Sequence, residues 1–209
     1  VGTLTGDVVI FKMGADGQLL ECARTNQGSK AISCLQYAPT GLLLAAASED
    51  MLMRVLLPDE EHRTVGVCKG HLSPICSIDW TDDGEYMQTS DTALELIFWS
   101  MKTRIEKPHG ALPEFVAYSK PMLLYKRQWA SFTTPLGWPW HGIYTPGSEA
   151  VGLNAVDRFI LDRGSKKALG VSADASGLVK LFPYPNQAGT TGMQVRKFEA
   201  HSAGVSKVR

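Results

Sequence analysis

Two stretches of the chain share one pattern at an offset of 43 residues: Ile32-Ser-Cys-Leu-Gln-Tyr-Ala-Pro-Thr-Gly41 and Ile75-Cys-Ser-Ile-Asp-Trp-Thr-Asp-Asp-Gly84. In both, the first and fourth residues are apolar, the sixth is aromatic and the tenth is glycine. An apolar run that ends in a glycine turn is typical of a β-strand followed by a hairpin. The chain therefore repeats one strand-and-hairpin unit.

The repeat extends along most of the chain and predicts an all-β fold made of WD40 β-propeller blades. A period of about 40 to 45 residues is typical of such blades. We expect the end of a preceding blade at 1–25, blades at 26–69, 70–152 and 153–199, and the start of a further blade at 200–209. Since a closed ring needs about four to eight blades, this partial arc is expected to belong to a larger propeller in a longer polypeptide.

The second repeat predicts a buried polar network. The pattern resembles that of WD40 blades, in which a histidine, a strand serine or threonine, a turn aspartate and a strand tryptophan form a buried network. Such a network satisfies buried polar groups and fixes the register of the strands. Here we expect His71, Ser90, Asp91 and Trp99, with His201 opening the last repeat in the same way. The alternative is general acid–base chemistry by a histidine with Asp79 or Asp91. The structural role is favoured.

Motifs for catalysis or for ligand binding are missing from the sequence. The patterns Gly-x-Ser-x-Gly, His-Glu-x-x-His and the phosphate-binding P-loop do not occur. Asp174-x-x-Gly177 predicts a turn, because a calcium loop would carry further carboxylates at alternate positions. A net charge of zero argues against a nucleic-acid surface, and no apolar run is long enough to span a membrane. We expect no enzyme activity, no cofactor, no metal, no nucleic acid and no membrane partner.

The repeat is interrupted in the blade at 70–152. We expect a long insertion at 101–128, followed by a segment rich in Trp, Gly and Pro at 129–144. The insertion concentrates basic side chains: Lys102, Arg104, Lys107, Lys120, Lys126 and Arg127. Up to Arg127, only Glu106 and Glu114 oppose them. A basic surface of this kind steers a protein toward an acidic partner, whereas a solvated loop is the alternative interpretation.

The irregular segment and the blade after it resemble the echinoderm microtubule-associated protein-like (EMAP-like, EML) family. The resemblance rests on these runs, in this order: Trp129-Ala130, Leu136-Gly-Trp-Pro139, Gly142-Ile-Tyr144, Leu153-Asn-Ala-Val-Asp-Arg158, Gly177-Leu-Val-Lys-Leu-Phe182 and Tyr184-Pro185. They cover about half of the chain together with their neighbours, and the Leu-Gly-aromatic-Pro run is not shared by WD40 proteins in general.

This resemblance implies a tandem pair of propellers, of which the chain would belong to the second. It also implies a non-enzymatic protein of the cytoplasm and cytoskeleton, possible also in the axoneme of cilia, that binds tubulin and microtubules and other cytoskeletal or axonemal proteins. The basic insertion would then contact the acidic tubulin surface. A WD40 scaffold of another cytoplasmic or ciliary complex is the alternative, and a propeller enzyme is a third possibility, for which converging catalytic groups are not seen.

Overall fold

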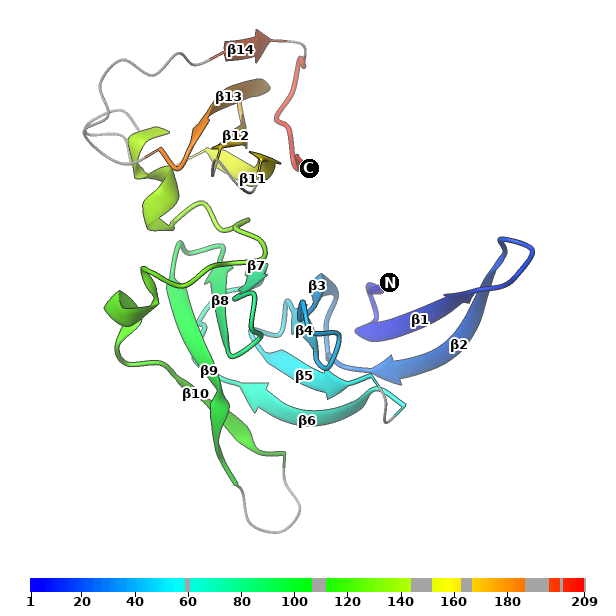
Figure 1. Cartoon of the computed structure of the whole chain (residues 1–209). Coiled ribbons are helices and arrows are strands. Elements are labelled where there is room, and N and C mark those ends of the chain that lie inside the picture. Colours follow the sequence, from blue (N-terminus) through cyan, green and yellow to red (C-terminus); the bar gives the residue numbers. More distant parts are fainter. Residues whose placement is uncertain are drawn as a thin grey trace. The chain divides into compact units, whose positions relative to one another are not determined.

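The structure is a computed structural model that describes residues 1–58, 61–106, 112–143, 152–162, 167–186, 196–199 and 201–208 (Figure 1). Of Arg104, His141 and Asp162 it describes the backbone alone. The chain divides into two compact units, Val1–Ala130 and Ser131–Arg209. Both are built on β-sheets, and the predicted all-β propeller class is confirmed.

The first unit begins with a two-stranded antiparallel sheet of β1 (Asp7–Met13) and β2 (Leu19–Asn26). A register shift between Ile10 and Phe11 interrupts the pairing. Val8 and Val9 are both buried, and Val8 belongs to a core cluster with Leu44, Ala46 and Leu56. This sheet therefore packs against the strands that follow it.

Two four-stranded meanders make up the rest of the first unit (Figure 1). The first contains β3 (Ile32–Tyr37), β4 (Leu44–Ser48), β5 (Met53–Leu57) and β6 (Arg63–Cys68). The second contains β7 (Ile75–Trp80), β8 (Tyr86–Asp91), β9 (Leu96–Ile105) and β10 (Glu114–Ala117). The two repeated stretches form β3 and β7, which lie side by side, and each is followed by a turn in which Gly41 or Gly84 has a positive φ angle.

The main core lies within these two meanders. Trp80, Met87 and Trp99 of the second meander are fully buried, as are Met53 and Val55 of the first. All five belong to one cluster. Alternate residues of a strand point to the same face, so these side chains form the apolar faces along which the meanders pack.

An edge contact merges the two meanders into one eight-stranded sheet. The outer strands β6 and β10 pair in parallel, with Glu114 opposite Val67 and Phe115 opposite Cys68. The Val67 N–H donates to the Pro113 carbonyl oxygen at 2.8 Å. Gly66 is required here, because an added Cβ atom would lie 2.5 Å from Cε2 of the buried Phe115 ring. The segment expected as an insertion at 101–128 thus contains the end of β9, all of β10 and the 3-10 helix η2 (Pro121–Leu124).

The second unit is a further four-stranded meander that follows the 3-10 helix η3 (Trp138–Ile143). Its strands are β11 (Leu153–Asp162), β12 (Lys167–Asp174), β13 (Leu178–Tyr184) and β14 (Arg196–Glu199). Trp140 of η3 is fully buried and packs edge-on against Phe182 and Tyr184 of β13, with ring centroids 5.7 and 5.0 Å away. The aromatic segment therefore anchors η3 to this sheet.

Candidate functional site

A buried chain of hydrogen bonds crosses the second meander. The His71 Nδ1–H donates to Oδ2 of Asp91 at 3.0 Å, because a carboxylate can only accept. Nε2 of His71 lies 2.7 Å from Oγ1 of Thr89, and the Trp99 indole N–H donates to the same oxygen at 2.8 Å. Every member of the network therefore has a hydrogen-bond partner.

Asp91 also closes the turn between β8 and β9. Its Oδ1 accepts backbone N–H groups from Ala93 at 3.0 Å and from Glu95 at 2.9 Å. Leu94 within this turn has a φ angle of 66°, a left-handed conformation that non-glycine residues seldom adopt. The carboxylate therefore ties the turn to the histidine in front of β7 and stabilises a strained backbone.

Ser90, which we expected in this network, lies outside it, and Thr89 takes its place. Neighbouring residues of a strand point to opposite faces, so Thr89 and Asp91 face His71 while Ser90 faces away. Oγ of Ser90 lies 2.6 Å from Oγ of Ser77, its cross-strand partner on β7. The structure thus joins His71, Thr89, Asp91 and Trp99.

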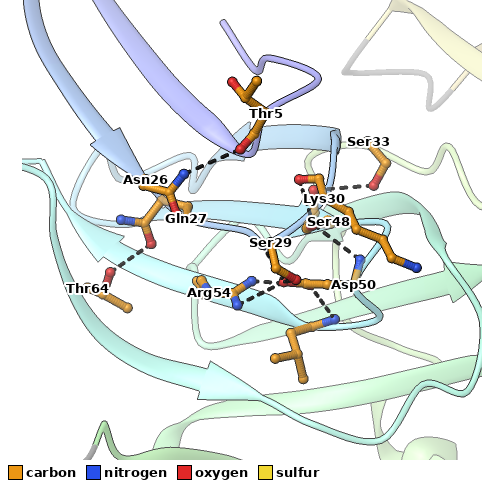
Figure 2. A network of polar contacts seen from close by, with 12 residues as sticks. Thr5, Asn26, Gln27, Ser29, Lys30, Ser33, Ser48, Asp50, Arg54 and Thr64 are labelled. Carbon is orange, nitrogen blue, oxygen red and sulfur yellow. Dashed lines mark hydrogen bonds and ion pairs between the residues drawn. The ribbon is translucent and has the colours of Figure 1, made fainter.

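The first meander lacks this network and contains a different one (Figure 2). The 43-residue offset places the following residues at its four positions: Gly28, Ala46, Ser48 and Leu56. In this meander Asp50, two residues after Ser48, accepts a hydrogen bond from the Ser29 N–H at 3.1 Å. Its Oδ2 also binds the Arg54 side chain at 2.9 Å. Burial alone would raise the pKa of Asp50, but the hydrogen bonds from Arg54 and from the Ser29 and Leu52 N–H groups outweigh it and lower that pKa.

The chemical capacity of the buried network is limited by its hydrogen bonds. Within the part of the chain that the structure describes, ligand atoms of His71, Asp91 and Glu95 lie within 4.8 Å of one another. Both ring nitrogens of His71 are already engaged, and its side chain is 1% exposed. Asp79, the other acid considered, is buried and accepts from the Gln88 side chain at 3.1 Å. This arrangement supports a structural role and offers no access to a substrate.

Two of the six basic residues expected at a binding surface are paired with acids. Lys102 binds Glu85 at 2.6 Å, and Arg127 binds Asp83 at 2.6 Å and lies over the Tyr86 ring at 5.2 Å. Both carboxylates come from the turn between β7 and β8. The local excess of positive charge is therefore partly neutralised by residues distant in sequence.

The remaining four basic residues differ in what the structure shows. Lys120 and Lys126 are exposed on either side of η2. The Arg104 side chain and Lys107 lie outside the described residues. His201, expected to open a further blade, follows β14 with an exposed side chain, and its carbonyl oxygen lies 2.4 Å from where a Cβ atom on Gly177 would stand.

Among the described residues, no helix combines the length and apolar character needed to cross a bilayer.

Comparisons with known proteins agree with the motifs. The family model described as the echinoderm microtubule-associated protein second beta-propeller matches residues 1–209. Echinoderm microtubule-associated protein-like 2 of Rattus norvegicus is 31% identical, over 100% of this chain and 29% of that protein. The 77 kDa echinoderm microtubule-associated protein of Strongylocentrotus purpuratus is 30% identical, over 87% of this chain and 24% of that protein. The ciliary WD repeat-containing protein ctxp80 of Euplotoides octocarinatus is 29% identical, over 81% and 22%.

A solved structure supports the same fold. A chain in the crystal structure of the mitotic checkpoint complex matches 99% of this chain and 62% of its own length, with a TM-score of 0.63 at 14% identity. It is a WD40 propeller. The chain spans less than a third of the length of the curated relatives described above. Motifs, fold and family model together show that the chain belongs to the echinoderm microtubule-associated protein-like family, within its second β-propeller.

Proposed function

We propose that the chain is part of a non-enzymatic propeller that binds tubulin in the microtubule lattice and serves as a cytoskeletal scaffold in the cytoplasm or the axoneme. The observation that carries the proposal is the match of the whole chain to the second propeller of a family whose members are named for microtubule association. The ciliary relative favours an axonemal setting among the possible ones. Other cytoskeletal or axonemal proteins are further partners under this proposal.

The structure supports a scaffold because the polar network of the second meander is buried. In the second meander, His71, Thr89, Asp91 and Trp99 satisfy one another and are at most 5% exposed. Such a network fixes the strands and presents no reactive group to solvent. Partner binding then falls to surface loops carried on the rigid sheets. We also propose that the blades follow the boundaries 26–69, 70–152 and 153–199.

Within the basic set, the exposed lysines beside η2 are the best placed to contact an acidic lattice. Lys102 and Arg127 are already bound to carboxylates, so they contribute less long-range attraction. Lys120 and Lys126 are exposed, and within the described residues neither of them forms an ion pair. We therefore assign the tubulin contact first to Lys120 and Lys126.

Co-sedimentation of the intact protein with polymerised microtubules tests the proposal. Binding should occur at low salt and weaken as salt rises, because screening reduces attraction between exposed charges. The double substitution Lys120→Glu and Lys126→Glu should weaken binding by about three- to ten-fold. Lys12→Glu with Lys30→Glu, two exposed lysines elsewhere, makes the same change of net charge and is the matched control.

Two outcomes contradict the proposal at different levels. Absence of pelleting at low salt would exclude tubulin binding and leave the scaffold of another cytoplasmic or ciliary complex. Pelleting that is equal for both lysine pairs would retain tubulin binding but exclude Lys120 and Lys126 as its contact.

A further inference from the structure

Large apolar side chains are displayed to solvent around the 3-10 helix η2. Met122 is 83% exposed, Leu123 64% and Tyr125 47%. The exposed Lys120 lies two positions before Met122 in the sequence, and the exposed Lys126 directly follows Tyr125. We call these five residues the η2 patch. Clustered exposed apolar side chains with a polar rim are typical of protein interaction sites.

A buried side chain and backbone hydrogen bonds hold the η2 patch in a fixed conformation. Leu124, in the middle of the segment, is 3% exposed and anchors it to the first unit. The Leu123 N–H donates to the Lys120 carbonyl oxygen, and the Arg127 N–H to that of Leu124, both at 3.0 Å. The adjoining backbone is also fixed, since the Tyr118 N–H donates to the Phe98 carbonyl oxygen at 2.6 Å. A rigid site loses little conformational entropy when a partner binds.

The end of the segment is secured by charge and by the sheet. Arg127 binds Asp83 at 2.6 Å, and the Asp82 N–H donates to the Gln128 carbonyl oxygen at 3.0 Å. Trp129, buried, bridges to Thr81. Arg127 thus holds the segment against the sheet. Lys120 and Lys126 of the η2 patch remain available to contact a partner.

The charges of the η2 patch define its partner. Along the sequence, a lysine stands on each side of the exposed apolar residues. A complementary ligand places carboxylates on either side of an apolar side chain. We propose that the η2 patch binds an acidic polypeptide segment that carries an apolar side chain between its acidic residues. Met122 and Leu123 would contact the apolar side chain, and Lys120 and Lys126 the carboxylates.

This proposal shares two lysines with the tubulin contact proposed above but rests on the η2 patch alone. It concerns a class of peptide, and its binding assay uses peptides in the absence of microtubules. Failure of one proposal is therefore distinguishable from failure of the other.

Fluorescence anisotropy of labelled peptides with the intact protein provides the test. The probe is a glutamate-rich peptide with a central phenylalanine, compared with the same peptide carrying serine in its place and with a lysine-rich version. Burial of a phenylalanine ring should make the first peptide bind on the order of ten-fold more tightly than the serine peptide. The lysine-rich peptide should not bind.

Two variants of the protein locate the binding. Met122→Ser with Leu123→Ser, and separately Lys120→Glu with Lys126→Glu, should each weaken binding of the phenylalanine peptide by about ten-fold. Lys12→Glu with Lys30→Glu makes the same change of net charge as the lysine variant and is its matched control. Leu72→Ser, at a side chain that is also 83% exposed, is the control for loss of an exposed apolar side chain. Both controls should bind as wild type does. All substituted side chains are exposed, so unchanged circular dichroism spectra are expected.

Several results would overturn the proposal. These are equal binding of the phenylalanine and serine peptides, no binding of either, or patch variants that bind as tightly as the controls. Microtubule pelleting of the Met122 and Leu123 variant is measured in parallel. Lost peptide binding with unchanged pelleting supports the η2 patch as a site for acidic segments other than the lattice.

Discussion

Thr89 is the central member of the buried network, and its hydroxyl can be removed with little change of shape. Thr89→Val replaces the hydroxyl by a methyl group, which is nearly isosteric, so the substitution tests hydrogen bonding without opening a cavity. Two partners are then left without their bond: the Trp99 indole N–H and Nε2 of His71. Trp99 is 0% and His71 5% exposed, so water cannot replace the lost partner.

The expected loss follows from those two groups. A buried donor or acceptor left unsatisfied costs about 1–3 kcal/mol. Two of them give about 2–6 kcal/mol in the free energy of unfolding. Ser90→Ala removes the bond to Ser77 and the weaker 3.6 Å contact with Sγ of Cys76, and should cost about 1 kcal/mol. Thr89→Ser keeps the hydroxyl and should lose about 1 kcal/mol for the missing methyl group.

The measurement is the shift in the melting temperature of the intact protein, with urea unfolding as the second method. For a domain of this size, about 1 kcal/mol corresponds to about 2–4 °C. Thr89→Val should therefore lower the melting temperature by roughly 4–24 °C, and Ser90→Ala by a few degrees. In a double-mutant cycle with Trp99→Phe, which removes the indole donor, the two losses should not add.

The relative destabilisation by Thr89→Val and by Ser90→Ala decides which of the two residues belongs to the network. If Ser90→Ala destabilised the protein more than Thr89→Val, the assignment of Thr89 would be wrong and the original expectation right. Additive losses in the cycle with Trp99→Phe would exclude the bond between Thr89 and Trp99.

Two further predictions concern charge and backbone conformation. Because the pKa of Asp50 is lowered in the folded state, its bond to Arg54 stabilises the fold above about pH 4 and is lost as pH falls through the folded-state pKa. Asp50→Asn should therefore flatten the loss of stability on acidification, as followed by circular dichroism between neutral and acid pH. Gly177→Ala should cost about 2–3 kcal/mol, since its φ is +89° and the new Cβ atom would stand 2.4 Å from the His201 carbonyl oxygen. Gly41→Ala, at a φ of +73° with no atom within 4 Å, should cost only about 1 kcal/mol in the same thermal melts.

The sequence predicted the strands best where the repeat is regular. The 43-residue offset located β3 and β7 and their glycine turns, because apolar alternation and a positive φ both leave a residue-level signal. The same offset also carried information that was not used. In the first meander, the positions 43 residues before His71, Thr89, Asp91 and Trp99 are occupied by glycine, alanine, serine and leucine. These residues indicate that the first meander lacks the network.

The choice between Thr89 and Ser90 depends on which face of the sheet each side chain of strand β8 points to. Both residues are hydroxyl-bearing and buried, so composition cannot separate them. Counting back two positions from Asp91 along the strand would have selected Thr89, since alternate residues share a face.

The charge at the expected insertion could not be read from the local sequence. Counting acids and bases between Met101 and Arg127 omitted Asp83 and Glu85, which approach from the turn between β7 and β8. The exposure of Met122 beside the burial of Leu124 is equally invisible in composition. Tertiary contacts decide both, because neutralisation and exposure depend on which segments meet.

The short parallel pairing of β6 with β10 has a consequence for how the first unit opens. Because Val67 and Phe115 join the two meanders at their outer strands, neither meander can detach without breaking this junction. Amide hydrogens of β5 and β9, which flank it, should then exchange with solvent through a shared opening and show similar protection. Two consecutive repeats in sequence thereby become a single cooperative unit in unfolding, with the missing side chain of Gly66 as the condition for it.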